Sequence, residues 1–305
     1  MRIASGIGQS MISSSIGSTL RLTAAVLFFS CPAVLAQTPA PAPPPDVPVA
    51  PARPAQIDLN LINLPTTMSI ARHHGYFRLT HRFASDLRRG TLGQQAADLF
   101  SLDRGAIIGL EYRFGITSNI QAGVHRSMFN KTIQTFGRWD AVPQGSFPVA
   151  VSLTLSLEGV NNLRDKYQQG IAITASRTFG DRLALYATPA FVAGTHAVDI
   201  VEGHEGHDIG SGGVDPHAHH QDTWFAGLGG RLRFSGTGYI TGEYTPRLGG
   251  YDPNAAEWGV AVEKRTGGHT LQLNFTNSFG TTFGQLARGG SAHDVYLGFN
   301  ITRRF

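Results

Sequence analysis

The closing stretch of the chain, HDVYLGFNITRRF, constrains the fold more than any other segment. Its apolar residues fall on one side of an extended strand: Val295, Leu297, Phe299, Ile301 and Phe305. A period-2 segment of this length matches the roughly 9 to 11 residues that a tilted strand needs to cross a bilayer. An aromatic residue closing such a strand is typical of bacterial outer-membrane β-barrels. We therefore expect a transmembrane strand here, with Phe305 as an assembly signal for the barrel-assembly machinery.

An apolar run near the N-terminus predicts export. Leu20 to Ala36 reads LRLTAAVLFFSCPAVLA, an apolar core followed by a small-residue cleavage site. The run is too short for a membrane anchor and contains Pro32. Initiation at Met11 is an alternative start. The sequence thus predicts a signal peptide over residues 1–36 and location in the bacterial outer membrane.

The only cysteine, Cys31, lies within this signal. Cleavage after Ala36 would leave no cysteine for disulfide or thiolate chemistry. Lipidation of Cys31 is the alternative, although Phe28-Phe29-Ser30 is a poor lipobox. Loss of the signal removes two arginines and no acidic residue, so the formal net charge falls from +4 to +2. This weak surplus gives no basis for nucleic-acid binding, which requires clustered Lys and Arg.

Residues 37–64 are expected to form a periplasmic leader. The run from Thr38 to Gln56, TPAPAPPPDVPVAPARPAQ, is rich in proline and alanine and predicts a semi-rigid extended spacer. Contact with peptidoglycan or with a partner protein is the alternative role. The barrel itself is assigned to residues 65–305.

The rest of the chain reads as many short strands. After the signal it has no run of 18 apolar residues, so bilayer-spanning helices are excluded and a closed barrel must do the spanning. Twelve strands are expected, at 75–84, 105–115, 118–128, 131–139, 148–158, 166–178, 182–193, 222–235, 238–248, 255–265, 268–279 and 293–305. The predicted fold class is all-β: a closed antiparallel up-and-down transmembrane β-barrel of about twelve strands. Ten strands is the alternative, if 75–84 or 131–139 is not a strand.

The connections provide an independent test of this topology. If Phe305 ends in the periplasm, the periplasmic connections are 116–118, 140–147, 179–181, 236–237 and 266–267. Four of these five are short and rich in turn residues. The opposite side receives the longest loops, 85–104, 194–221 and 280–292. Short periplasmic turns and long outer loops are typical of outer-membrane barrels; a soluble β-sandwich or lipocalin-like barrel is the alternative.

The polar face of these strands would line a lumen. It collects ten charges, equally divided in sign: Arg78, Arg82, Glu111, Arg113, Glu158, Arg231, Arg233, Glu243, Glu257 and Glu263. Since an unpaired buried ion is costly, we expect cross-strand ion pairs, for example between Glu111 or Glu243 and a neighbouring arginine. The charges then either fix the barrel as a structural ladder or tune passage through a small pore.

A histidine-rich segment lies in the longest predicted loop. Half of the twelve histidines fall there, and the candidate metal ligands are His204, His207, His217, His219 and His220. Imidazole and the interleaved carboxylates suit Zn²⁺, Ni²⁺ or Cu²⁺. A solvated loop with incidental metal affinity, a metal-capturing loop and a pH-responsive gate are the three interpretations. No other cofactor is expected.

Catalysis is not expected. His125 and Ser127 share a strand face, which permits a Ser–His contact of the kind that outer-membrane phospholipases use. Ile120, Ala122 and Val124 mark the lipid side of this strand, so the pair would face the lumen. We therefore predict that the protein is not an enzyme.

Three segments are similar to an uncharacterised bacterial family, a domain of unknown function described as a membrane-bound β-barrel. They are LTHRF (79–83), LFSLDRG (99–105) and EYRFGITSNIQAGVHRSMFNKT (111–132). The turn departs from the family pattern, with Ser118-Asn119 where an acid is often found. The resemblance implies an outer-membrane barrel and no particular activity. We also expect His81, Arg82, Asp103, Arg126 and Ser127 to form a polar cluster.

The sequence therefore predicts a monomeric barrel in outer-membrane lipid. Its expected function is that of a narrow pore or passive channel for small solutes or ions. The alternative is a non-conducting envelope scaffold or binding protein with a metal-attracting outer loop.

Overall fold

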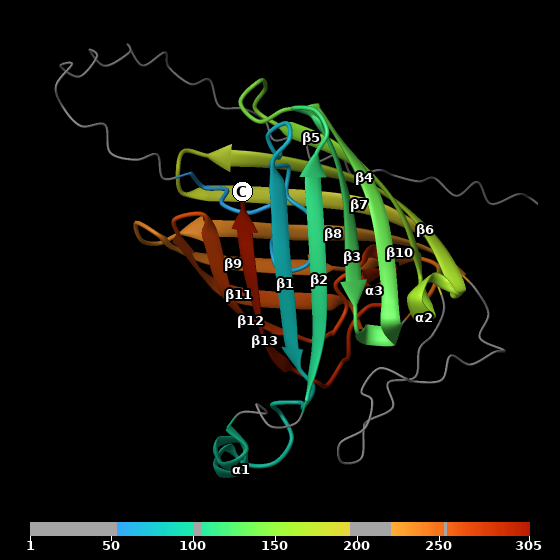
Figure 1. The fold of residues 1–305 in the computed structure, drawn as a ribbon. Helices are drawn as coiled ribbons and strands as arrows, with labels where there is room; N and C mark the ends of the chain where they lie inside the picture. The colour runs from blue at the N-terminus through green and yellow to red at the C-terminus, as the bar shows by residue number, and fades with distance from the viewer. Residues whose placement is uncertain (1–53, 100–104, 196–220, 253–254) are drawn as a thin grey trace, which may run out of the picture. The chain divides into compact units, whose positions relative to one another are not determined.

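The computed structural model describes residues 54–99, 105–195, 221–252 and 255–305 (Figure 1). Its strands are β1 (Gly75–Phe83), β2 (Ala106–Gly115), β3 (Ile120–Ser127), β4 (Thr132–Val142), β5 (Ala150–Gly159), β6 (Asp165–Phe179), β7 (Leu183–Thr195), β8 (Gln221–Arg233), β9 (Gly238–Thr245), β10 (Arg247–Gly249), β11 (Glu257–Thr266), β12 (His269–Thr276) and β13 (Tyr296–Arg304). The helical turns are α1 (Leu92–Ala97), η2 (Phe129–Lys131), α2 (Val160–Leu163) and α3 (Phe283–Ala287). Each of the twelve predicted strands coincides with a strand of the structure. The predicted signal peptide lies outside the described residues.

The sheet closes on itself. Sequential strands pair antiparallel from β1 to β8, β1 also pairs with β13, and the return runs through β12 and β11 to β9. The β8–β9 pairing completes the ring. The short β10 follows β9 and pairs with the same neighbour, β8. The result is a closed antiparallel barrel of twelve strands, as predicted.

Alternation along the strands decides which side chains face outward. In β5, Ser152 and Thr154 are buried, whereas Leu155 is 54% exposed. The large exposed apolar side chains of β8, Trp224, Leu228 and Leu232, likewise alternate with inward residues. A soluble barrel would bury its apolar face. The outward apolar surface therefore suits lipid, and the predicted strand faces are confirmed.

The two ends of the barrel differ in their connections. At one end, short turns span 116–119, 180–182, 234–237 and 267–268, and Gly75 and Phe305 exchange two main-chain hydrogen bonds, at 2.7 and 3.0 Å. The 143–149 connection, the exception among the predicted turns, lies at this end too. At the other end lies the long loop 277–295, together with residues 84–99 after β1. The histidine-rich segment lies outside the described residues.

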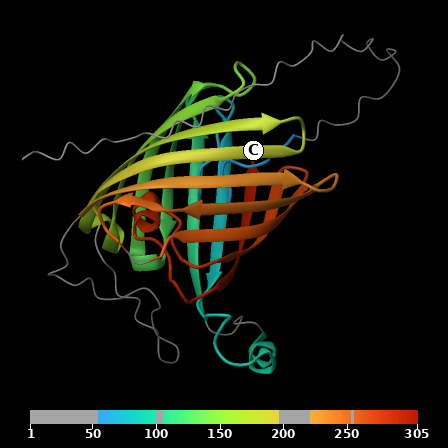
Figure 2. The same cartoon turned by 180° about the vertical axis from the view of Figure 1, so that it is seen from behind.

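Two segments that belong to no strand occupy the interior. The chain before β1, drawn in blue, lies within the ring of strands (Figure 1). The loop between β12 and β13 folds inward and carries α3, whose five residues are all buried (Figure 2). In the described part of the chain, no helix has the length and apolar character needed to span a membrane.

Candidate functional site

Residues 54–70, here called the lumen segment, form a hairpin inside the barrel. The main chain of Leu61 donates to Leu64 at 2.8 Å, and that of Thr66 donates to Leu59 at 2.9 Å. These bonds place a turn at residues 61–64. Five apolar side chains of the segment are at most 2% exposed: Ile57, Leu59, Leu61, Ile62 and Leu64. The hairpin is therefore fully enclosed by the strands.

The tip of this hairpin is bound by a single carboxylate from β9. Glu243 accepts the main-chain N–H groups of Ile62, Asn63 and Leu64, at distances between 2.9 and 3.1 Å. Three converging N–H groups make a turn into an anion-binding concavity. The N–H groups of the turn thus complement the negative charge of the Glu243 carboxylate on the barrel wall.

The carbonyl groups of the tip face donors on other strands. Gln272 donates to the carbonyl of Leu61 at 2.8 Å, and Arg231 donates to that of Asn60 at 2.7 Å. The carbonyl of Ile62 accepts from Arg78 and, at 3.1 Å, from Asn300. Because these main-chain donors and acceptors have partners on the barrel wall, the tip can be buried although it pairs with no strand of the barrel.

Two asparagines extend the contact. Asn63 donates to Glu257 at 3.0 Å and accepts from Arg82 at 3.0 Å. Asn60 accepts from Arg113 at 2.8 Å. The two asparagines thus supply additional hydrogen-bond partners for three charged side chains of the barrel wall.

The base of the lumen segment is held near the short-turn end. Asp58 accepts hydrogen bonds from the hydroxyls of Tyr76 and Thr302, both at 2.7 Å. Arg304 donates to the carbonyl of Ile57 at 3.0 Å. Tyr76 lies at the start of β1, and Thr302 and Arg304 lie at the end of β13. These bonds show that the segment enters the barrel through this end.

Residues 277–290, here called the lumen loop, enter from the opposite end. Glu158 on β5 accepts from the Thr282 hydroxyl at 3.1 Å and from the main chain of Gly284 at 2.9 Å. Thr282 also caps α3 by accepting from the main chain of Gln285. The Gln285 side chain donates to the carbonyl of Phe129 at 3.1 Å. The first turn of α3 is thereby fixed to the barrel wall.

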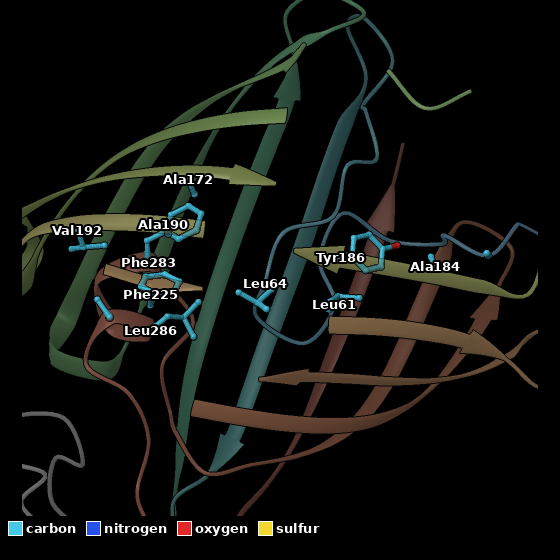
Figure 3. Close-up of a cluster of buried hydrophobic side chains, with 12 residues drawn as sticks. Leu61, Leu64, Ala172, Ala184, Tyr186, Ala190, Val192, Phe225, Phe283 and Leu286 are labelled. Atoms are coloured by element: carbon cyan, nitrogen blue, oxygen red, sulfur yellow. The ribbon is translucent and has the colours of Figure 1, made fainter. Parts of the chain in front are cut away.

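The two inserted segments share one apolar cluster. Leu61 and Leu64 of the lumen segment belong to the same buried cluster as Phe283 and Leu286 of α3 (Figure 3). Its wall side comes from small or aromatic residues of β6, β7 and β8, among them Phe225. A cavity of about 30 Å³ lies beside this cluster, lined by both segments and by β1, β2, β4 and β5. The buried side chains of this cluster thus occupy the lumen around the two inserted segments.

Nine of the ten predicted lumen charges lie inside the barrel and are at most 5% exposed. The tenth, Arg233, lies at the short-turn rim and pairs with Asp181, which is 65% exposed. Arg78 and Glu111 form an expected cross-strand pair at 3.3 Å. Glu243 differs from expectation, since its hydrogen-bond partners are main-chain N–H groups rather than an arginine. The difference arises because the lumen segment reaches it.

Three further charged residues face the lumen that were not among the predicted lumen charges. Arg138 and Asp140 of β4 form a buried pair at 2.7 Å, and Arg288 after α3 donates to Gln168 at 3.4 Å. Period 2 from Gln134 would have identified the first two as inward. Nothing comparable marks Arg288, because a loop has no fixed period.

The start of the barrel interior also differs from the expected domain boundary. Residues 54–64 were assigned to an external leader, yet they pack in the lumen. The reason is composition: the prolines end at Pro54, and IDLNLINL then supplies apolar side chains and hydrogen-bonding amides. The remainder of the predicted leader lies outside the described residues.

The four described residues of the predicted polar cluster do not come together. His81 stacks on Phe299 with ring centroids 4.6 Å apart, whereas Arg82 points inward to Asn63 and Asn300. Successive residues of a strand face opposite sides, which separates the two. Arg126 binds the carbonyl of Ser127, and Asp103 lies outside the described residues.

The other candidate residues give no assembled catalytic or metal site. His125 Nε2 lies 3.3 Å from the Thr281 hydroxyl, and its Nδ1 lies 3.6 Å from Glu111. The Ser127 hydroxyl accepts from the main chain of Phe129 at 3.2 Å. Both side chains are buried in the lumen, so bilayer lipid does not reach them. The histidines of the predicted metal loop lie outside the described residues, and the part that is described contains no group of three or more potential metal ligands.

Outward apolar strands and an inward charged lumen define a membrane β-barrel with a filled interior. The chain belongs to the family described as "Membrane bound beta barrel domain" (DUF5777), whose model matches residues 58–305. This range includes most of the lumen segment, so the hairpin is part of the family's domain. The resemblance seen in the sequence is thereby confirmed. No protein with a curated description matches the sequence.

Solved structures with low sequence identity are also similar. The NanC porin has 9% identity and a TM-score of 0.45, and the match covers 75% of this chain and 97% of that chain. The KdgM porin, solved with disordered oligogalacturonate, has 8% identity and a TM-score of 0.43, over 76% and 99% of the two chains. An outer membrane channel from Pseudomonas putida F1 has 13% identity and a TM-score of 0.42, over 78% and 97%.

Proposed function

We propose that the protein is a narrow passive channel of the outer membrane for small solutes or ions, and that the lumen segment and the lumen loop hold it closed. The proposal rests on the charged side chains of the barrel wall that face the hairpin. Glu243, Arg78 and Arg231 contact the hairpin through hydrogen bonds to its main chain, and water can replace such bonds.

Withdrawal of the lumen segment would leave the barrel intact. The strands of the closed ring pair only with one another, and residues 54–70 take no part in these pairings. Only residues 71–74 connect the hairpin to β1. A charged wall exposed in this way is suited to a hydrated passage, in which paired charges tune the flow of ions.

The apolar cluster that contains Leu64 and the α3 residues Phe283 and Leu286 contributes to the closed state. Because both inserted segments supply side chains to it, moving either segment disrupts the cluster. We expect the intact chain to open infrequently, because the hairpin loses many hydrogen bonds at once. Conduction in this proposal requires movement of the hairpin and is increased further when the loop is shortened.

Single-channel recording in planar bilayers tests the proposal. Three proteins are compared: the intact barrel, a variant lacking residues 54–70, and that variant with residues 279–288 replaced by a short Gly-Ser linker. We expect rare openings, frequent openings and larger steady openings, respectively. Heat-modifiable migration of each protein on gels provides the control for folding. Silence from all three folded barrels would contradict a channel.

The second candidate is a non-conducting envelope scaffold or binding protein. The dense apolar cluster of Leu61, Leu64, Phe283 and Leu286 favours it, since such packing stabilises a permanently filled barrel. Under this alternative the histidine-rich loop would attract divalent Zn²⁺, Ni²⁺ or Cu²⁺. Silence of the doubly trimmed barrel would select it.

The remaining expectations belong to the same proposal. We propose a monomer in outer-membrane lipid, exported through the signal at residues 1–36 and inserted by the barrel-assembly machinery, with Phe305 as the assembly signal. No catalytic role is proposed, because His125 and Ser127 are each bound to other groups.

A further inference from the structure

The cavity between the two inserted segments has an unusual lining. It measures about 30 Å³ and is bordered by three arginines, Arg78, Arg113 and Arg138, all at most 4% exposed. One carboxylate, that of Glu111, borders it as well. A cavity with this many buried cations differs from the apolar voids that remain empty in protein cores.

The residues that line the cavity are mostly cationic among their charged groups. Glu111 is shared between Arg78, at 3.3 Å, and Arg113. Arg138 is neutralised by Asp140 at 2.7 Å. The third group near Glu111 is His125, which adds no negative charge. Among the residues that line the cavity, three guanidinium groups face the single carboxylate of Glu111, so the lining carries more positive than negative groups.

Donors at the cavity also lack acceptors. Three of its lining residues each have a buried polar atom without a hydrogen-bond partner in the described structure: Nη1 of Arg138, Nδ2 of Asn60 and Oγ1 of Thr154. All three atoms can donate. Buried donors of this kind are normally paired, so their number at one cavity indicates a missing acceptor.

We propose that this cavity binds a small monovalent anion, with chloride as the representative ligand. Such an ion accepts hydrogen bonds from several donors at once and places a negative charge beside the three guanidinium groups. The volume suits it, since one water needs roughly 10–15 Å³ measured in this way. A polyatomic organic anion such as gluconate is too large. The site does not depend on conduction, because binding requires no open lumen.

Bromide is the first probe, because its anomalous scattering identifies it. Crystals of the full chain in detergent, exchanged into sodium bromide, should show an anomalous peak within hydrogen-bond distance of Arg138 and Thr154. Unfolding in urea at constant ionic strength supplies the second measurement, with sodium chloride compared with sodium gluconate. Chloride should raise the unfolding midpoint, since a ligand that binds the folded state stabilises it.

Two variants and one matched control assign the effect to this cavity. Thr154→Val removes one donor with little change of shape and should weaken chloride binding roughly tenfold, as expected for a hydrogen bond to a charged group. Arg138→Gln should abolish the chloride effect. Thr241→Val removes another buried hydroxyl without a partner that does not line the cavity, and should retain the full effect. If Arg138→Gln does not fold, Thr154→Val still decides.

Each outcome has a defined meaning. A bromide peak together with a chloride effect that Thr154→Val weakens and Thr241→Val retains supports the site. A cavity without a peak, holding water alone, overturns it. A peak without any chloride effect in solution shows binding at crystal concentration only, and also overturns it. Binding without conduction would reject the proposed channel and leave the anion site standing.

Discussion

Glu243 accepts the main-chain N–H of Asn63 through both of its carboxylate oxygens, at 2.9 and 3.0 Å. The contact joins β9 to the tip of a hairpin that is remote from it in sequence. Hydrogen bonds to an ionised acceptor are roughly twice as strong as neutral ones. We therefore expect Glu243 to be one of the groups that hold the tip of the hairpin in the closed lumen.

Replacement of Glu243 by glutamine should loosen the hairpin. The neutral amide keeps the size of the side chain but weakens the bonds to Ile62, Asn63 and Leu64. A Thr67→Cys reporter, buried in the lumen segment, should then react with a maleimide at least tenfold faster. The chain is expressed without residues 1–36, so Cys31 is absent. Glu158→Gln, which alters the lumen loop instead, is the control; equal labelling in both variants would contradict the anchor.

Gly284→Ala should displace the lumen loop. A β-carbon at this position would clash with Oε1 of Glu158 and Oε1 of Gln168, so these side chains or the loop must move. We expect faster proteolysis of residues 277–290 and a higher open probability. Gly137→Ala on β4 is the matched control, because a β-carbon there meets no atom within 4 Å. Identical proteolysis of the two variants would show that the loop tolerates the added methyl group.

Removing one partner of the Arg231–Glu263 ion pair should destabilise the barrel much more than replacing both partners with apolar residues. Its atoms lie 2.7 Å apart and both side chains are at most 1% exposed. Glu263→Gln leaves Arg231 uncompensated and should lower the free energy of unfolding by about 3–5 kcal/mol. Arg231→Met combined with Glu263→Leu should recover most of this loss. Urea unfolding in lipid vesicles measures both.

Asp181→Asn serves as the control for that pair. Its partner Arg233 lies at the rim, and Asp181 itself is 65% exposed. Surface ion pairs contribute about 0–1 kcal/mol, so little change is expected. A loss as large as that of Glu263→Gln would show that burial does not determine the effect.

The histidine-rich loop should bind divalent cations weakly. His204, His207, His217, His219 and His220 provide imidazoles at spacings that let neighbouring side chains share one ion. Calorimetry of the refolded barrel should show heat on adding Zn²⁺, Ni²⁺ or Cu²⁺. A variant lacking residues 196–220 should show none. Absence of heat from the intact barrel would remove the metal proposal.

The strands and their faces were predictable because period 2 is a local property. In β5 and β8 the inward and outward residues can be read directly from the sequence, and neighbouring strands then follow by antiparallel pairing. The lumen charges were predictable for the same reason. Arg233 was misplaced only because the strand reaches the rim at that position, and strand ends are less regular than strand centres.

The hairpin could not be predicted by the same reasoning. Residues 57–61 alternate like a strand, yet both of their faces are buried because barrel wall surrounds them. Alternation of apolar and polar residues normally shows which face of a strand is buried and which is exposed. Inside a lumen both faces are buried, so the alternation does not distinguish them. The contact of Glu243 with residues 62–64 is equally hidden, since any polar main chain could satisfy that carboxylate. The only available signal was a run of apolar residues and asparagines directly after the last proline of the predicted leader.

A reversible cross-link between the hairpin and the barrel wall tests the closed-lumen account most directly. The hydroxyls of Thr67 in the lumen segment and Ser176 on β6 lie 2.5 Å apart, so Thr67→Cys and Ser176→Cys place two thiols in contact. Single-channel recording of this double variant compares the same barrel oxidised and reduced. The account predicts silence with the disulfide formed and the return of infrequent openings after reduction. Openings that persist unchanged while the disulfide is intact would contradict it.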